Sequence, residues 1–516
     1  MSTHQLFTLA KIIILFFAII FVLPVQAQTG VYTLNGGTAS QANQTYAATL
    51  TDQSAVYVFN SGHLTLTNCT MTKTGDASNV NNSSQYGTNA GVLAKSAGIV
   101  VISGGSVTTN ALGANGLFAT GTGSSVSMSD GTINASGSSA HGVDATYGGS
   151  ISLTNVNVTS TGANSSVLAT DFGGGTVTVS GGTIIASATE ANSHSAGIYS
   201  TGNITVTGAT VISSGDCGGV IDGANTINLI NTSLAGKLEG IKLWNTTPAS
   251  GSATVTINGG SLTATTGNAF YVTGEAGNTA NGIITLSGGA VINAGTGNII
   301  KAVSPSTVNF TADNESLTGN MITSGNSTIT AMLKNNTTLT GRINVAALSI
   351  DSTSSWTLTG NSILTTLIDP SGISGLLVTN ITGNGYSVHY DSSLTGNEYL
   401  GGLTYSLVNG GVLTPEAINS IEEHQSVAST DWILYQNYPN PFRSTTTISF
   451  ELFKPAYVTL KIYDILGNQI KVLFNKMGNI GKYAIPFAVN GLGNGIYYYQ
   501  LNVDGAIQTQ KMIIQK

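Results

Sequence analysis

The fold of this chain is decided by a stretch that runs Val126-Ser127-Met128-Ser129-Asp130-Gly131-Thr132-Ile133. Val126 and Met128 share one face of a short strand, because successive side chains of a strand point to opposite faces. Ile133 is the next apolar residue, five positions after Met128 and beyond a turn. The stretch therefore predicts two short strands joined by a sharp corner.

The same apolar pair occurs ten times between residues 64 and 310. Eight of the nine steps from one pair to the next are 23 to 29 residues long, and a fixed period of this size is typical of stacked repeat proteins. In nine of the ten repeats another apolar residue follows five positions later. The pairs are Leu64/Leu66, Val100/Ile102, Val126/Met128, Ile151/Leu153, Val177/Val179, Ile204/Val206, Ile227/Leu229, Val255/Ile257, Ile284/Leu286 and Val308/Phe310.

Each repeat closes with a third apolar stretch, such as Leu117-Phe118-Ala119. Glycine pairs such as Gly104-Gly105 stand at the corner between the first two strands, where glycine permits a positive φ. Three short strands in a coil of about 26 residues predict an all-β, right-handed parallel β-helix whose coils stack about 4.8 Å apart. An array of β-sandwiches is disfavoured, because it requires recurring Asn-Gly or Asp-Gly hairpin turns.

The chain has two cysteines, Cys69 and Cys217. They fall in the first and the sixth of the marked coils, so five steps separate them by roughly 24 Å. A disulfide requires Cα atoms within about 7 Å of each other. The repeat therefore predicts two free thiols.

The first 27 residues have the pattern of a cleavable secretory signal peptide. Lys11 precedes an apolar run from Ile12 to Val25, and small residues stand at the −3 and −1 positions before a cleavage site between Ala27 and Gln28. A retained membrane anchor is the alternative, but the run is shorter than the roughly 20 residues that span a bilayer. We expect residues 28–414 to form the β-helix rod.

The end of the rod, at about residues 350–414, differs from the repeat. It contains Trp356-Thr357-Leu358-Thr359-Gly360, Gly385-Tyr386-Ser387-Val388-His389-Tyr390 and Asn397-Glu398-Tyr399-Leu400-Gly401. These segments resemble the closing coils of autotransporter-type passenger β-helices, and the rod as a whole is pectin-lyase-like. A solenoid needs such atypical coils to cover its apolar end. We expect them to be capping coils, followed by a polar linker at 415–433.

Residues 434–516 have a different composition, with fewer glycines and alternating apolar strands such as Val458-Leu460-Ile462. Several short strands in about 80 residues predict a small antiparallel, immunoglobulin-like β-sandwich. The segment also contains short motifs at Tyr438-Pro439-Asn440-Pro441-Phe442, Gly467, Gly495, Tyr497 and Lys511. In this order the motifs resemble the type A C-terminal sorting domain of the type IX (Por) secretion system.

The resemblance implies that an outer-membrane secretion translocon recognises this domain after the chain has reached the periplasm. The protein is then secreted, or is attached to lipopolysaccharide at the cell surface of a Gram-negative bacterium. Whether the domain is removed stays open. Nucleic acid is not expected as a partner, because charged residues make up 8% of the chain, the net charge is −7 and no basic patch is present.

No catalytic constellation can be recognised in the rod, and neither a metal nor a cofactor is predicted. Glycoside hydrolysis needs two carboxylates at a defined separation, and the acids of the rod stand singly. We expect His141 to be a surface turn residue. Asp144 and Asp171 lie in the third strand and in the turn after it, where they could share a face, and we expect them to be solvated.

The middle residues of the third strands predict an exposed stripe, if the residues on either side of them point inward. Aromatic groups in such a stripe predict a binding surface for a glycan, a partner cell or a host ligand, and Phe118, Tyr199 and Tyr271 are its candidate residues. The whole stripe would be Phe118, Asp144, Leu168, Tyr199, Ile221, Lys242, Tyr271 and Ile300.

Two functions remain open from the sequence. The first is a non-catalytic, adhesive or structural protein of the cell surface. The second is a polysaccharide-degrading enzyme, either a lyase or a glycoside hydrolase. A paired carboxylate cluster on one face of the rod would favour the second function.

Overall fold

The structure is a computed structural model, and its chain forms two compact units, within residues 1–417 and 418–516. The predicted signal peptide, Gly467 and most of the predicted linker lie outside the described residues. The structure describes residues 28–188, 195–247, 251–275, 277–303, 305–416, 432–464, 469–489, 491–503 and 506–515.

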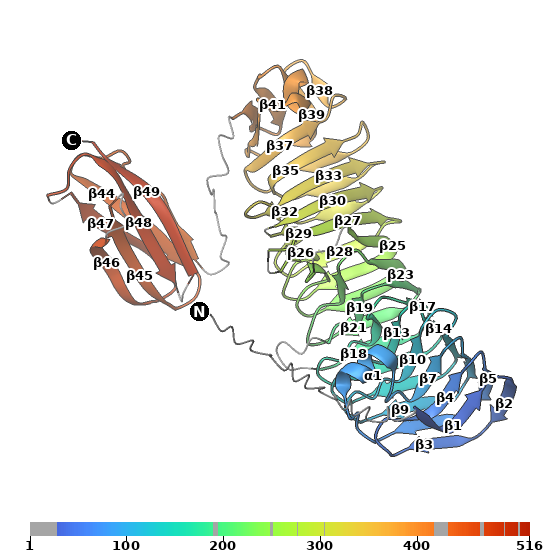
Figure 1. The fold of residues 1–516 in the computed structure, drawn as a ribbon. Helices are drawn as coiled ribbons and strands as arrows, with labels where there is room; N and C mark the ends of the chain where they lie inside the picture. The colour runs from blue at the N-terminus through green and yellow to red at the C-terminus, as the bar shows by residue number, and fades with distance from the viewer. Residues whose placement is uncertain are drawn as a thin grey trace, which may run out of the picture. The chain divides into compact units, whose positions relative to one another are not determined.

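The first unit is a parallel β-solenoid of about 14 turns between residues 29 and 415 (Figure 1). Each coil contributes one strand to each of three stacks, here called the first-strand, second-strand and third-strand stacks. The first-strand stack comprises β2 (Thr38–Ala42), β5 (His63–Thr67), β8 (Ile99–Ser103), β11 (Ser125–Ser129), β14 (Ser150–Thr154), β17 (Thr176–Ser180), β20 (Asn203–Thr207), β23 (Thr226–Gly236), β25 (Ala253–Ala264), β27 (Ala280–Ser287), β30 (Ser306–Asp313), β33 (Thr328–Lys334), β35 (Ile343–Ile350) and β37 (Ser362–Ile368).

The second-strand stack follows the corner after each of these strands, and the long strands β23 and β25 run through that corner. Its other members are β3 (Thr45–Ala48), β6 (Thr70–Lys73), β9 (Ser106–Thr109), β12 (Thr132–Ala135), β15 (Asn157–Ser160), β18 (Thr183–Ala186), β21 (Thr210–Ser213), β28 (Val291–Ala294), β31 (Ser316–Thr318), β34 (Thr338–Thr340), β36 (Ser355–Thr357), β39 (Leu377–Thr382) and β41 (Tyr405–Val408).

The third-strand stack carries the candidate site. It comprises β1 (Thr29–Asn35), β4 (Gln53–Phe59), β7 (Val92–Lys95), β10 (Leu117–Thr120), β13 (Val143–Thr146), β16 (Leu168–Asp171), β19 (Ile198–Ser200), β22 (Gly219–Asp222), β24 (Ile241–Asn245), β26 (Phe270–Gly274), β29 (Asn298–Ala302), β32 (Asn320–Thr323), β40 (Val388–Tyr390) and β42 (Val412–Pro415). Between β32 and β40 the stack continues through the first residues of β35 and β37, whose later residues belong to the first-strand stack.

The pairing of the strands confirms the predicted stacking. Met128 lies opposite Ile102 on one side and opposite Leu153 on the other, and Leu153 lies opposite Val179. All four side chains are buried in one continuous core. The alternation of small polar and branched apolar residues therefore forms a column of apolar side chains inside the solenoid.

Glycine is required at the corner between the first two strands. Gly105 has a φ of +80°, and a Cβ atom on it would lie 2.1 Å from the carbonyl oxygen of Cys69 in the coil before it. This position therefore needs both a left-handed backbone conformation and a close approach between coils. Cys69 and Cys217 are both free and buried, as predicted.

An insertion between β6 and β7 explains the one long repeat and holds the helix α1 (Val80–Tyr86). The Asn79 side chain accepts a hydrogen bond from the backbone N–H of Asn82, and Gly87 ends the helix with a φ of +67°. These are the usual caps of a short helix. Figure 1 shows α1 against the blue and cyan coils, where the Gln85 carbonyl accepts a 2.9 Å hydrogen bond from the Thr146 hydroxyl.

The far end of the solenoid leaves the repeat pattern. Two strand pairs there are antiparallel, namely β38 (Ile373–Ser374) with β39 and β41 with β42, and a 3-10 helix, η1, spans Thr395–Leu400. Trp356 and Tyr390 are fully buried in these coils. The Trp356 indole N–H donates to the Gly341 carbonyl at 2.9 Å, so this large aromatic residue is satisfied within the core.

The second unit is built from two antiparallel sheets that share one core, which confirms the predicted small sandwich. One sheet contains β43 (Trp432–Leu434), β44 (Thr445–Leu452) and β47 (Gly481–Ala488). The other contains β46 (Gln469–Gly478), β45 (Ala456–Tyr463), β48 (Gly495–Val503) and β49 (Ala506–Ile514). Among the described residues, no helix has the length and apolar character needed to cross a membrane.

Candidate functional site

The outward row of the third-strand stack differs from the predicted stripe in three places. Leu168, Ile221 and Ile300 are completely buried and point into the core. Leu168 lies opposite Val143 and Ile198, which are also core residues. The prediction placed these three residues one position out of register, because apolar runs in this stretch do not mark where each strand begins. The observed row is Phe118, Asp144, Ala169, Tyr199, Val220, Lys242, Tyr271 and Lys301.

Phe118 is not an exposed binding residue, which corrects that part of the prediction. It faces outward, yet none of its surface is exposed. It packs with Leu93 and Tyr57 in a small cluster outside the main core, and a Cβ atom on Gly87 would lie 2.5 Å from its ring. The insertion that carries α1 therefore covers Phe118.

Tyr199 and Tyr271 are partly exposed, and they belong to a larger surface that we call the open face. The open face consists of Tyr199, Asp222, Lys242, Trp244, Tyr271 and Lys301, which all come from β19, β22, β24, β26 and β29. The row of Tyr199 includes Lys242, Tyr271 and Lys301, whereas Asp222 and Trp244 lie opposite each other two residues further along their strands.

Contacts within the open face hold several of its side chains. The Tyr199 hydroxyl donates to Asp222 at 3.5 Å, and the Thr246 hydroxyl donates to the same carboxylate at 2.7 Å. The Lys242 ammonium lies 3.9 Å from the centre of the Trp244 ring, a cation–π contact. Burial raises the pKa of Tyr271, with a smaller contribution from the charge of Glu239. The face thus offers aromatic rings together with both signs of charge.

His141, Asp144 and Asp171 form a cluster on the same stack, beside α1. One ligand atom from each of the three side chains lies within 4.8 Å of the others. His141 is 8% exposed and Asp144 is fully buried, so the expectation of a surface histidine and a solvated Asp144 is wrong. The insertion and the neighbouring turns cover what would otherwise be an outward face. Asp171 is half-buried at the end of its strand.

The register explains why the cluster forms. Asp171 lies in the coil that follows Asp144. It is opposite Thr146, which stands two positions after Asp144 on β13. Both carboxylates therefore point to the outer side of the stack as diagonal neighbours. The signal in the sequence is the spacing of 27 residues between the two aspartates, which is one coil, from Asp144 to Ala169, plus two positions along the strand. His141 joins them from the turn just before β13, where the Asn115 side chain accepts a 2.7 Å hydrogen bond from its backbone N–H.

Burial dominates the electrostatics of this cluster. It raises the pKa of Asp144 well above its ordinary value, and the neighbouring charge of Asp171 raises it further. Burial also raises the pKa of Asp171, although the nearby His141 acts in the opposite direction. The pKa of His141 is lowered, because burial disfavours the imidazolium form.

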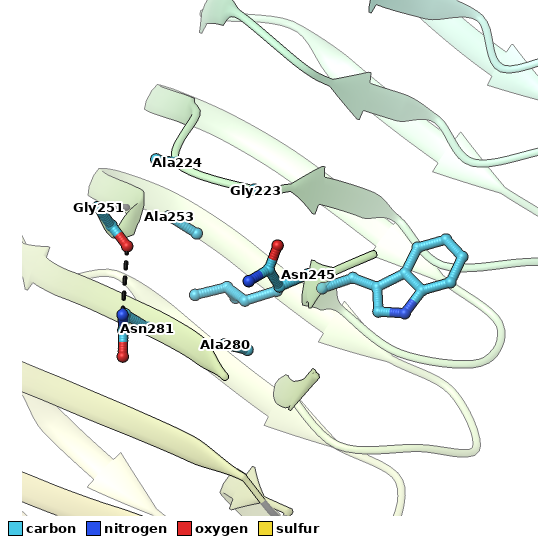
Figure 2. A pocket seen from close by; sticks show the side chains of 9 residues that line it. Gly223, Ala224, Asn245, Gly251, Ala253, Ala280 and Asn281 are labelled. Carbon is cyan, nitrogen blue, oxygen red and sulfur yellow. Dashed lines mark hydrogen bonds between the residues drawn. The ribbon is translucent and has the colours of Figure 1, made fainter. Parts of the chain in front are cut away.

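Figure 2 shows a small cavity further along the third-strand stack, at the end of β24. Its volume is about 10 Å³, which is close to the smallest space that holds one water molecule. The Asn245 amide N–H donates to the Thr279 carbonyl at 2.7 Å, while its buried carbonyl oxygen has no partner among the described residues. A single water that satisfies this oxygen is what the cavity can hold; it is too small for a substrate.

In the second unit, the motif at 437–442 lies against the last strand, β49. The Asn440 side-chain carbonyl accepts a 2.8 Å hydrogen bond from the Ile513 backbone N–H. The Phe442 backbone N–H donates to the Ile513 carbonyl at 3.0 Å. Asn437 is buried, and its backbone N–H donates to the Tyr499 hydroxyl at 2.8 Å. The two ends of the domain are thus tied together by motif residues.

The motif residues differ in exposure. Phe442 is 3% exposed and belongs to the core, whereas Tyr438 is 82% exposed. Pro439, Pro441, Lys511 and Gly495 are also exposed, and Tyr497 is half-buried with its hydroxyl donating to the Gly493 carbonyl at 3.2 Å. The structure therefore separates motif residues that hold the sandwich together from those that a partner can reach.

Residues 436–515 match the family described as the secretion system C-terminal sorting domain. A comparison with curated proteins gives no match. Among solved structures, the enzymatically active domain of tailspike protein 4 of bacteriophage CBA120 aligns with 10% identity and a TM-score of 0.13. That alignment covers 88% of this chain and 64% of the tailspike chain, and a likeness this weak carries no argument. The chain is a parallel β-solenoid followed at residues 436–515 by a type IX secretion sorting domain, which indicates export to the cell surface or secretion.

Proposed function

We propose that this protein is an exported, non-catalytic adhesive protein whose solenoid binds a polysaccharide along its open face. The single observation that carries the proposal is the register that places Lys242, Tyr271 and Lys301 in one outward row, with Trp244 beside it. Tyrosine and tryptophan present large rigid rings with a polar edge, which suits contact with sugar rings and hydroxyl groups.

The dimensions of the open face also support a polymeric ligand. Coils stack about 4.8 Å apart, so the three steps from Tyr199 to Tyr271 span roughly 14 Å. The side chains lie on strands whose backbones are fixed by hydrogen bonds to the coils on both sides. A rigid surface of this kind loses little conformational entropy when it binds.

The route of export extends the proposal. A signal peptide at residues 1–27 takes the chain to the periplasm and is removed between Ala27 and Gln28. The translocon then recognises the sorting domain, after which the protein is released or fixed to lipopolysaccharide on the cell surface. The exposed motif residue Tyr438 is our candidate for direct contact with the translocon.

Carbohydrate binding is tested with a glycan array and the purified full chain that starts at Gln28. We expect the double variant Tyr199→Ser, Tyr271→Ser to bind its glycan at least about tenfold more weakly, since two aromatic contacts of about 1 kcal/mol each are lost. Tyr386→Ser is the matched control, because Tyr386 is a 40% exposed tyrosine far along the chain, in the closing coils. Equal binding by the double variant and the control would remove the open face as the binding site.

Export is tested by deleting residues 436–516 and measuring the protein on the cell surface and in the medium. We expect loss from both, with accumulation inside the outer membrane. Tyr438→Ala is expected to reduce export while leaving the sandwich folded, because the side chain of Tyr438 is almost free of contacts with the domain. Normal export of the deletion variant contradicts the proposed route.

A polysaccharide-degrading enzyme is the second candidate, and the Asp144–Asp171 pair is the observation that favours it. Glycosidases use two carboxylates that flank the scissile bond. The complete burial of Asp144 opposes this role, because a polymer cannot reach that carboxylate. A depolymerisation assay decides the matter: activity that is present in the native chain and lost in Asp171→Asn would establish the enzyme.

A further inference from the structure

We propose that His141, Asp144 and Asp171 bind one divalent transition-metal ion, of the Zn²⁺ class, between two neighbouring coils of the solenoid. The proposal is independent of carbohydrate binding, because these three residues lie outside the open face. It rests on the convergence of three ligand-type side chains, on an unsatisfied buried carboxylate, and on the hydrogen bond that orients the histidine.

The three side chains converge although they come from separate places in the chain. His141 lies in the turn before β13, Asp144 lies within β13, and Asp171 ends β16 in the next coil. One ligand atom of each lies within 4.8 Å of the other two. Tetrahedral zinc bonds of about 2.0–2.2 Å place ligand atoms about 3.4 Å apart. Binding therefore requires the ligand atoms to approach one another by up to about 1.4 Å, and Asp171 is the half-buried member of the three.

Asp144 supplies the observation that points to a ligand. Its side chain is fully buried, and neither carboxylate oxygen accepts a hydrogen bond of normal geometry from the residues that the structure describes, although the backbone N–H of Ala145 lies close enough to oppose the rise of its pKa. A buried carboxylate without a partner is unfavourable, and the neighbouring charge of Asp171 is of the same sign. A cation between the two carboxylates removes both penalties together.

One ring nitrogen of His141 already lies against a backbone carbonyl. Its Nδ1 atom lies 3.1 Å from the Ser166 carbonyl oxygen. A proton on Nδ1 satisfies this carbonyl and leaves the lone pair on Nε2 free. Metal-binding histidines commonly donate their other ring N–H to a backbone carbonyl in this way, which fixes both the tautomer and the ring orientation.

The donor set indicates the kind of ion. One imidazole nitrogen and two carboxylates suit Zn²⁺ and its transition-metal neighbours, and three protein ligands leave the fourth position for water. Ca²⁺ is disfavoured because it takes six to eight oxygen ligands. The bound ion would connect β13, β16 and the turn before β13, so we expect it to stabilise the coils beside α1.

The test uses the untagged full chain that starts at Gln28, stripped with a chelator, dialysed and then incubated with Zn²⁺. We expect one ion per chain after gel filtration, measured by elemental analysis. We also expect a rise in Tm of about 2 °C or more, because an ion that binds the folded state stabilises it. Asp144→Asn, His141→Gln and Asp171→Asn should each retain at least about tenfold less Zn²⁺ and show no rise in Tm.

Two controls make the result specific. Asp130→Asn changes an exposed aspartate at the corner between β11 and β12 and should still bind one ion. The double variant Cys69→Ala, Cys217→Ala should also bind one ion, which excludes the thiols as ligands. The proposal is overturned if the native chain retains no Zn²⁺, if Asp144→Asn retains as much as the native chain, or if retention depends on the cysteines. Should Asp144→Asn fail to fold, Asp171→Asn at the half-buried strand end carries the same comparison.

Discussion

The third-strand stack has two halves that are alike in backbone and different in surroundings. In the covered half, β10 and β13 lie under the insertion that holds α1, and Phe118 and Asp144 are fully buried. In the open half, β24 and β26 present Lys242 and Tyr271 to solvent. All four residues occupy the same outward position of their strands. Register thus decides which way a side chain points, and the turns decide whether it meets water.

The chemical character of the outward side chains differs between the two halves in the same way. Under the insertion the outward residues include Leu93 and Phe118, which form a second, small apolar cluster outside the main core. In the open half they include two lysines and two tyrosines. The covered half therefore acts as structure, and the open half is available for binding. The cluster of His141, Asp144 and Asp171 belongs to the covered half, at β13 and the end of β16.

The largest expected contrast is between Phe118→Ala and Tyr271→Ala. Removing a fully buried phenylalanine ring should lower the free energy of unfolding by about 3–5 kcal/mol. Removing the partly exposed Tyr271 ring should change it by about 0.5 kcal/mol or less. Denaturant unfolding, followed by circular dichroism, measures both. Equal losses would mean that the insertion does not cover Phe118 in solution.

A second contrast concerns Lys73, which is buried at the C-terminal end of β6, just before the insertion. Burial lowers its pKa to about 8, although Asp52 and Asp76 act in the opposite direction, and its ammonium donates to the Leu50 carbonyl at 2.6 Å. The unfolded chain holds this proton up to about pH 10.4. The free energy of unfolding should therefore rise with pH between about 8 and 10.4.

Lys73→Met should abolish this rise, which we expect to be on the order of 2 kcal/mol. The measurement is a set of denaturant curves across that pH range, with Lys334→Met as the control, because Lys334 is a lysine on the solenoid surface paired with Asp313 at 3.1 Å. Parallel pH profiles for the native chain and Lys73→Met would show that Lys73 is hydrated.

The inside of the solenoid could be predicted from the sequence, because one apolar pair per coil specifies a column such as Ile102, Met128 and Leu153. The sequence did not allow an equally accurate prediction of which residues point outward. The sequence predicts an outward Leu168 because the run Val167-Leu168-Ala169 is apolar at every position, so no alternation of polar and apolar residues marks its two faces. Only the pairing with Val143 reveals the register.

The covered half was missed for a different reason. The helix α1 has the sequence Val-Asn-Asn-Ser-Ser-Gln-Tyr, which is short and consists mostly of poor helix formers. Its visible signals were the caps, Asn79 and Gly87, and the one long repeat of 36 residues. When the helix is not foreseen, the sequence predicts that Phe118, His141 and Asp144 are surface residues. With it, two of them become a candidate ion site.

A third prediction concerns a substitution that destabilises the helix α1, which covers this half of the stack. Asn79→Ala removes the side chain that caps α1 and should cost the helix about 1 kcal/mol. Hydrogen exchange should become roughly fivefold faster at the α1 amides, such as those of Ser83 and Gly87, and remain unchanged at β26 in the open half. Asn134→Ala, on the outer side of β12, is the control. Faster exchange along the whole solenoid would contradict the local role of the helix.

The smallest expected effect is in the open half, where Lys242 lies over the Trp244 ring. Lys242→Gln removes a cation–π contact at an exposed site and should cost about 0.5 kcal/mol. Trp356 and Trp432 are buried, so a shift in the accessible part of the tryptophan fluorescence reports on Trp244. Lys301→Gln, in the same row without a ring beneath it among the described contacts, should leave the spectrum unchanged. A decrease in the free energy of unfolding for Lys242→Gln as large as that for Phe118→Ala would contradict the distinction between the two halves. An open surface is expected to contribute to binding without supporting the fold.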